Sequence, residues 1–208
     1  MATPNHLTKF KDAAQARALT LVAATDSAKR LDSDHYVEGY AALYEPYVLY
    51  YDGDEPIYER FAPGCFDSAD MGDIIMQYDH CGRVMARTAN GTLVVEADER
   101  GLFFAADLGR TEPARSLYDD VAAGMVTKMS WRFRVGDAYY DEATRTLVHT
   151  RIAKVYDVSA VSIPANDDTV INARALVDGE IARAARRDAE LDERRRRLRL
   201  KIQTHTNE

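Results

Sequence analysis

The stretch KMSWRFRV, residues 128–135, contains a serine whose chemistry depends on where its side chain points. Side chains alternate between the two faces of a strand. One face should therefore carry the large apolar residues Met129, Trp131, Phe133 and Val135. The opposite face should carry Ser130, Arg132 and Arg134. Most strand serines have no chemical role, and a serine nucleophile needs a base within hydrogen-bond reach and a third group that orients the base.

Of the five histidines, two lie within the part of the chain that has a clear strand pattern, and these two, His80 and His149, are candidates for that base. If residues 74–80 form a strand, His80 stands at its end, before a CGR loop that would open the site. Histidine is the most frequent general base in enzymes. The alternative is a hydrogen-bonded structural histidine at the edge of the core, and His80 alone does not separate the two.

Asp157, in VYDVSAV, is a carboxylate within an otherwise apolar strand, where a charge needs a partner. That partner is either a structural one (Lys154, Arg151 or a backbone amide) or the imidazole of His80. His149 could instead be the third member of the site. The spacing does not decide between these alternatives.

Other chemistries find little support. His80 and Cys81 are adjacent, which is poor metal geometry, and no second Cys/His pair completes a zinc site. The phosphate-loop patterns GxGxxG and GxxxxGK are absent, as is the GxSxG pattern of a nucleophile elbow. We therefore expect neither a metal nor a cofactor.

The elements that must position these residues are mainly strands. Aromatic and β-branched residues dominate from YVEGYAAL onward, with turn signals at Asp52-Gly53 and Asn90-Gly91. NGTLVVEADERGLFFAADL predicts two strands joined by a short turn, and TLVHTRIAKVYDVSAVSI predicts two more. TEPARSLYDDVAAG predicts a helix with Thr111 as N-cap and Gly124 at the end. The fold class predicted is mainly β (α+β), a barrel or curved sheet with flanking helices.

Composition limits the class of protein. The 208 residues carry a net charge of −7, which argues against a nucleic-acid binder, and two cysteines do not make a disulfide framework. We see no secretory signal or membrane span, and expect a soluble, intracellular protein.

We expect an N-terminal arm, partly flexible, over residues 1–35 and one domain over residues 36–172. Residues 173–208 should form a charged tail, helical or disordered, since residues 181–201 hold nine basic and four acidic side chains.

The ordered set of motifs resembles a known family. In chain order the motifs are GYAALYEP, YERFAPGCFD, YDH, GRVMARTANGTLVVEADERGLFFAADL, GMVTKMSWRFRV and VYDVSAVSIPAN. This order is similar to that of the prohead (capsid maturation) serine proteases of tailed phages, over about residues 38–170. These enzymes are similar in fold to the herpesvirus capsid maturation proteases.

The resemblance implies a serine endopeptidase with a β-barrel-like core and flanking helices. It implies that Ser130 is the nucleophile, His80 the base and Asp157 the third residue, with His149 still open because the herpesvirus relatives use a histidine there. The expected substrates are the scaffolding segment of the major capsid protein and the protease itself, cleaved inside the immature capsid in the host cytoplasm. A homo-oligomer is a candidate assembly.

Two positions depart from the family pattern. Cys81 replaces an aspartate that commonly follows the histidine, and Arg132 replaces a glycine on the face of Ser130. Arg132 would line the site, where it could clash with substrate, pair with a substrate carboxylate or help to stabilise an oxyanion. The competing hypothesis is a non-enzymatic scaffold or capsid-assembly protein.

Overall fold

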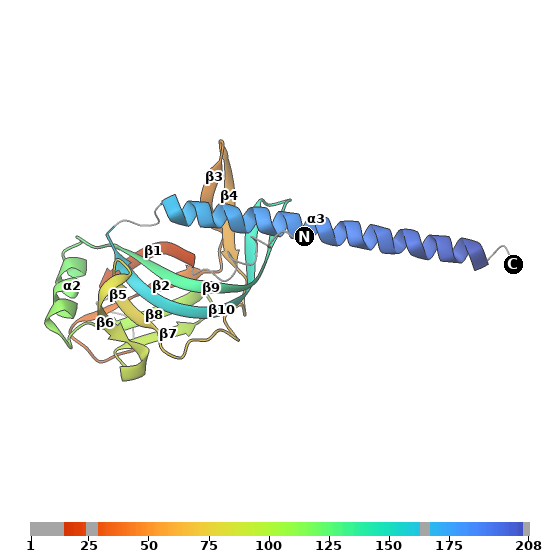
Figure 1. The fold of residues 1–208 in the computed structure, drawn as a ribbon. Helices are drawn as coiled ribbons and strands as arrows, with labels where there is room; N and C mark the ends of the chain where they lie inside the picture. Colours follow the sequence, from red (N-terminus) through yellow and green to blue (C-terminus); the bar gives the residue numbers. More distant parts are fainter. Residues whose placement is uncertain (1–14, 24–28, 163–166, 206–208) are drawn as a thin grey trace.

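The computed structural model describes residues 15–23, 29–162 and 167–205. In chain order the elements are β1 (Gln15–Ala23), β2 (Tyr36–Leu43), β3 (Tyr47–Asp52), β4 (Glu55–Phe61), β5 (Ile75–Tyr78), β6 (Cys81–Arg87), the short 3₁₀ helix η1 (Thr88–Asn90), β7 (Leu93–Ala97), β8 (Gly101–Asp107), α2 (Glu112–Ala122), β9 (Lys128–Asp141), β10 (Thr146–Val161) and α3 (Asp167–His205). Figure 1 shows strongly curved strands with α2 at one end and α3 crossing over the sheet.

The strands form one ten-stranded sheet with β9 and β10 at its centre. Its main path runs β3-β4-β10-β9-β1-β2-β8-β7, and β5 joins at β10 with β6 beyond it. Among the described residues no pairing joins β3 to β7, so the sheet is open. The mainly β, α+β class that the sequence predicts is confirmed, whereas closure into a barrel-like core is not.

The core is built on the apolar face of β9, as the alternation predicts. Trp131 and Phe133 are fully buried and stack with ring centroids 4.1 Å apart. Phe61 of β4 packs against both rings, at 5.4 and 5.6 Å. Burying an aromatic side chain of this size contributes about 1.5–3 kcal/mol, so this cluster fixes which face of β9 points inward.

β10 corrects one prediction, because residues 146–161 form a single strand where the sequence predicts two. Its pairing with β9 shifts register at four places between His149 and Asp157. Such bulges bend a strand and let one element continue where a regular strand would leave the sheet.

β1 falls in the stretch where the sequence predicts an arm. It pairs with β9 on one side and β2 on the other, and is therefore an interior strand. Residues 1–14 and 24–28 of the predicted arm lie outside the described residues.

The predicted helix is confirmed as α2. The Thr111 hydroxyl caps it by accepting a hydrogen bond from the Ala114 amide at 3.3 Å. Gly124 follows the helix with a φ of 72°, a left-handed conformation that suits glycine. The predicted strand pair is confirmed as β7 and β8.

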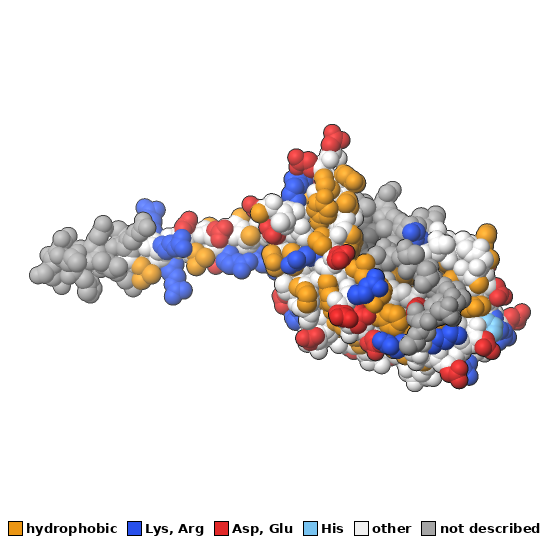
Figure 2. Space-filling view, turned by 180° about the vertical axis from the view of Figure 1, so that it is seen from behind, with side chains coloured by type: hydrophobic (Ala, Val, Ile, Leu, Met, Phe, Trp, Pro, Cys, Tyr) orange, Lys and Arg blue, Asp and Glu red, His pale blue; other side chains and the backbone are white. Residues whose placement is uncertain are grey.

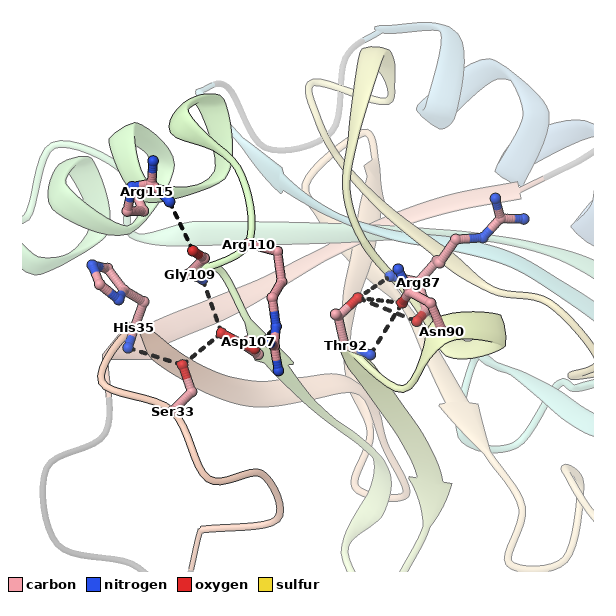
Figure 3. A network of polar contacts seen from close by, with 9 residues as sticks. All are labelled: Ser33, His35, Arg87, Asn90, Thr92, Asp107, Gly109, Arg110 and Arg115. Carbon is pink, nitrogen blue, oxygen red and sulfur yellow. Dashed lines mark hydrogen bonds and ion pairs between the residues drawn. The ribbon is translucent and has the colours of Figure 1, made fainter.

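Two polar clusters hold the loops beside β6 and β8 (Figure 3). In one, Thr92 Oγ1 accepts a hydrogen bond from the Arg87 amide at 2.9 Å, which fixes the corner after β6. In the other, the buried Asp107 carboxylate accepts from Ser33 Oγ at 2.6 Å and from Arg110 Nε at 2.7 Å. β6 is the hairpin partner of β5, so the first cluster supports the strand pair that carries His80.

α3 begins on the body of the protein and then projects away from it (Figure 1). Its inner part buries Val177 and Glu180 and contacts β9 and β3. The sequence of the tail is compatible with helix or with disorder, and its residues 173–205 are helical. Figure 2 shows basic and acidic side chains along the projecting part, and hydrophobic ones along the β3–β4 hairpin. Among the described residues, no helix is long and apolar enough to span a membrane.

Candidate active site

A bulge in β10 places Asp157 on the face of the sheet that carries Ser130. Val155 pairs with Phe133 and Asp157 pairs with Arg132, so Tyr156 is an extra residue on the β10 side. In a regular strand Asp157 would share the apolar face of Val155. The bulge reverses this alternation and turns the carboxylate to the opposite face, a known use of bulges beside functional sites.

Ser130 lies across from Ser159 on that same face. The two residues are direct partners in the β9–β10 pairing, and both are buried, Ser130 at 4% exposure. Directly opposed residues have Cβ atoms about 4.5–5.5 Å apart. Ser130 is therefore a diagonal neighbour of Asp157, two residues before Ser159 along β10.

His80 lies in a tight turn, which corrects the predicted strand over residues 74–80. β5 ends at Tyr78, and the CGR segment begins β6 instead of forming a loop. Asp79 and His80 have φ angles of 51° and 55°. Positive φ is uncommon outside glycine, although Asp and His are among the residues enriched there. Such a conformation costs of the order of 1–3 kcal/mol and persists only where its surroundings hold it.

Asp79 ties this turn to the end of β10. Its amide donates to the Ala160 carbonyl at 2.8 Å. Its carboxylate accepts from the Ser162 amide and the Ser162 hydroxyl, each at 2.8 Å. These three bonds offset the strain of the turn and fix the direction in which the His80 side chain leaves the backbone.

The His80 ring contacts Asp157 through Nδ1, which lies 2.5 Å from Oδ1. The side chains are 11% and 5% exposed. A carboxylate accepts hydrogen bonds, so Nδ1 carries the proton, and Nε2 of the neutral ring is an acceptor. His80 Nε2 is buried and has no hydrogen-bond partner in the described part of the chain. The Ser130 hydroxyl is therefore not bonded to it, and catalytic hydrogen bonds often tighten only when substrate binds.

Two further side chains surround the Asp157 carboxylate. Arg132 Nε lies 3.9 Å from Oδ2, with the arginine side chain 43% exposed, so this ion pair is long and weak. Ser159 donates its hydroxyl to Oδ1 at 2.9 Å. The sequence does not mark Ser159 as a site residue, and its position two residues after Asp157 is the one signal that it carries.

This arrangement can be compared with known proteins. A family model described as caudovirus prohead serine protease matches residues 23–181. The chain belongs to this family. The matched segment contains Ser130, His80 and Asp157 together with the strands that carry them. No curated protein and no solved structure matches the chain. Membership makes the protein a serine-type endopeptidase of the capsid maturation class.

In this prohead protease His149 lies apart from the other candidates. Its Nε2 is 2.7 Å from Glu59 Oε1, and both side chains are fully buried. The ring stacks on Phe61 with centroids 4.8 Å apart. The structure brings His149 to Glu59 and brings Asp157 to His80.

The two cysteines of the prohead protease are free thiols in different environments. Cys65 is buried, and burial first, with the nearby Asp67 carboxylate second, raises its pKa to about 12. Cys81 is exposed beside His80. Within the described ranges, no group of three or more His, Cys, Asp or Glu side chains could hold a metal ion.

Proposed function

We propose that Ser130 is the nucleophile of this prohead protease, His80 its general base and Asp157 the residue that orients the base. Ser130 Oγ attacks the peptide carbonyl carbon while His80 Nε2 takes the hydroxyl proton. His80 then gives that proton to the leaving amine as the peptide C–N bond breaks, and water completes the cycle by the same route. Asp157 keeps the proton on Nδ1 and stabilises the imidazolium that forms.

One observation supports these roles above the others. The His80 ring is bonded to a carboxylate through Nδ1, while its buried Nε2 has no partner among the described residues. A ring held in this way can accept a proton at Nε2. Ser130 is a buried serine on the same face, and its hydroxyl would supply that proton.

We further propose that the substrates are the scaffolding segment of the major capsid protein and the protease itself. Cleavage would take place inside the immature capsid in the host cytoplasm. Family membership supports a role in capsid maturation. Assembly into a homo-oligomer and the likeness in fold to herpesvirus proteases are part of the same proposal.

The decisive experiment is co-expression with the major capsid protein, followed by intact-mass measurement of both chains. Ser130→Ala should leave both chains at full mass, whereas wild type should give the processed forms. Ser116→Ala, on the exposed side of α2, is the matched control and should process normally. Normal processing by Ser130→Ala would show that Ser130 is not the nucleophile.

A serine-reactive phosphonate probe tests the enzyme against the non-enzymatic assembly protein without any substrate. Wild type should be labelled at Ser130, as found by peptide mapping. His80→Ala should be labelled far more slowly, because the hydroxyl would have no base.

A further inference from the structure

We propose that Ser159 is a positioning residue of this protease, which fixes the Asp157 carboxylate and keeps the proton of the nucleophile for His80. This proposal rests on the proposed function of Ser130, His80 and Asp157. It concerns a side chain that the triad scheme does not include.

The Ser159 hydroxyl is fully buried and is engaged on both sides. It donates to Asp157 Oδ1 at 2.9 Å and accepts from the Gln77 amide at 3.3 Å. A hydroxyl has one proton, so the Ser159 proton is committed to Asp157. A buried hydroxyl held in this way is not a second nucleophile.

These two bonds join the carboxylate to the strand that leads to His80. Gln77 lies in β5, and the turn with His80 follows directly after Tyr78. Asp157 Oδ1 therefore accepts from His80 and from Ser159 at the same time. A carboxylate held by two donors has little freedom to rotate, so Oδ1 stays directed at Nδ1 of the imidazole.

Ser159 also bears on where the Ser130 proton goes. Ser130 faces Ser159 directly across the β9–β10 pair, and Asp157 is its diagonal neighbour. Since Ser159 already donates to Oδ1, Ser130 does not need to satisfy the carboxylate. The Ser130 proton is left for His80 Nε2, the buried acceptor without a partner in the described part of the structure.

Ser159→Ala tests this directly, because it removes the hydroxyl without adding volume. Turnover of a peptide that spans a cleavage junction of the capsid protein should fall about 10- to 100-fold, the range expected for losing one hydrogen bond to a charged group. KM should change little, since no contact with substrate is lost. The strongly deshielded Nδ1 proton of His80 in the proton NMR spectrum should weaken or shift, and this readout needs no substrate.

A matched pair of variants separates the hydroxyl from the shape of the side chain. Ser159→Thr keeps a hydroxyl and Ser159→Val has nearly the same shape without one. Turnover by the threonine variant should exceed turnover by the valine variant. The ratio of these two rates should be similar to the ratio of the wild-type rate to the Ser159→Ala rate. If the larger side chains unfold both variants, the turnover and NMR results of Ser159→Ala test the proposal on their own.

The outcomes separate this inference from the proposed function. An inactive Ser130→Ala with a fully active Ser159→Ala would overturn the role of Ser159 alone, as would equal rates for the threonine and valine variants. An active Ser130→Ala would instead overturn the proposed function.

Discussion

His80 and Asp157 are 77 positions apart in the chain, yet His80 Nδ1 and Asp157 Oδ1 lie 2.5 Å apart. Two local irregularities produce this contact. The Asp79-His80 turn aims the ring, and the bulge at Tyr156 brings the carboxylate to the same face. The parallel pairing of β5 with β10 brings the two segments together, since Asp157 pairs with Ile75 and Ala160 with Tyr78, and His80 lies in the turn that follows Tyr78.

Asp157→Asn should reduce turnover about 10⁴-fold while the protein stays folded, as expected where a carboxylate sets the tautomer of a catalytic imidazole. An amide can donate to Nδ1, which would move the proton to Nε2 and remove the base. Steady-state kinetics with a junction peptide measure the loss, and circular dichroism verifies the fold. Asp70→Asn, which changes a half-exposed carboxylate bonded to Lys154, is the control and should keep its rate. Turnover of Asp157→Asn close to that of Asp70→Asn would contradict the role of Asp157.

His149→Ala should destabilise the fold and leave the chemistry of each folded molecule unchanged. The variant would leave Glu59 buried without its histidine partner and remove the ring stacked on Phe61. Breaking a buried pair in this way costs about 3–5 kcal/mol in the free energy of unfolding. Denaturant titration measures this, and the probe-labelling rate of the folded fraction reports on the site. A folded His149→Ala variant with labelling as slow as that of His80→Ala would place His149 in the active site after all.

The elements that follow local rules could be predicted from the sequence. The α2 helix has an apolar stripe within its own residues, with a threonine cap just before it and a glycine just after it. The apolar face of β9 over residues 129–135 follows from the alternation of side chains, which that part of the strand preserves. Farther along, Gly136 is an extra residue in the pairing and the alternation shifts, so that Ala138 is buried. These signals need no knowledge of the rest of the fold.

The parts of the site that the sequence did not predict depend on departures from those rules. A bulge adds one residue and reverses the alternation, and nothing in VYDVSAV marks Tyr156 as that residue. The His80 turn uses two residues without glycine in a left-handed conformation, which tertiary contacts from Ser162 and Ala160 hold in place. β1 is an interior strand because it pairs with both β2 and β9, and β9 lies far away in the sequence.

Asp107→Asn should lower stability at neutral pH and have less effect in acid. Burial alone would raise the pKa of the Asp107 carboxyl, but hydrogen bonds from Ser33, the Gly109 amide and Arg110 outweigh burial and lower the pKa below its ordinary value. A lowered folded-state pKa means that the stabilisation is complete above the unfolded value of about 3.9 and is lost as pH falls through the folded value. We expect a loss of about 1–3 kcal/mol at pH 7.

Urea titrations of wild type and Asp107→Asn across the acid range measure this dependence. The difference in free energy of unfolding should be constant above about pH 5 and shrink below about pH 4. Ser33→Ala removes one donor of the same cluster and should show a smaller loss with the same trend (Figure 3). A difference that grew toward low pH would mean that the folded-state pKa of Asp107 is raised.

Iodoacetamide should alkylate Cys81 in the folded protein and leave Cys65 unmodified. The thiolate is the reactive form of cysteine. Cys65 is 1% exposed with a pKa of about 12, so at about pH 8 it is both shielded and protonated. Mass measurement should show one adduct on the folded chain and two after denaturation, and Cys81→Ser should give none while folded. Rapid modification of Cys65 in the folded protein would show that the segment after β4 opens. Phe66 of that segment would then not be a fixed support for the ring of Trp131.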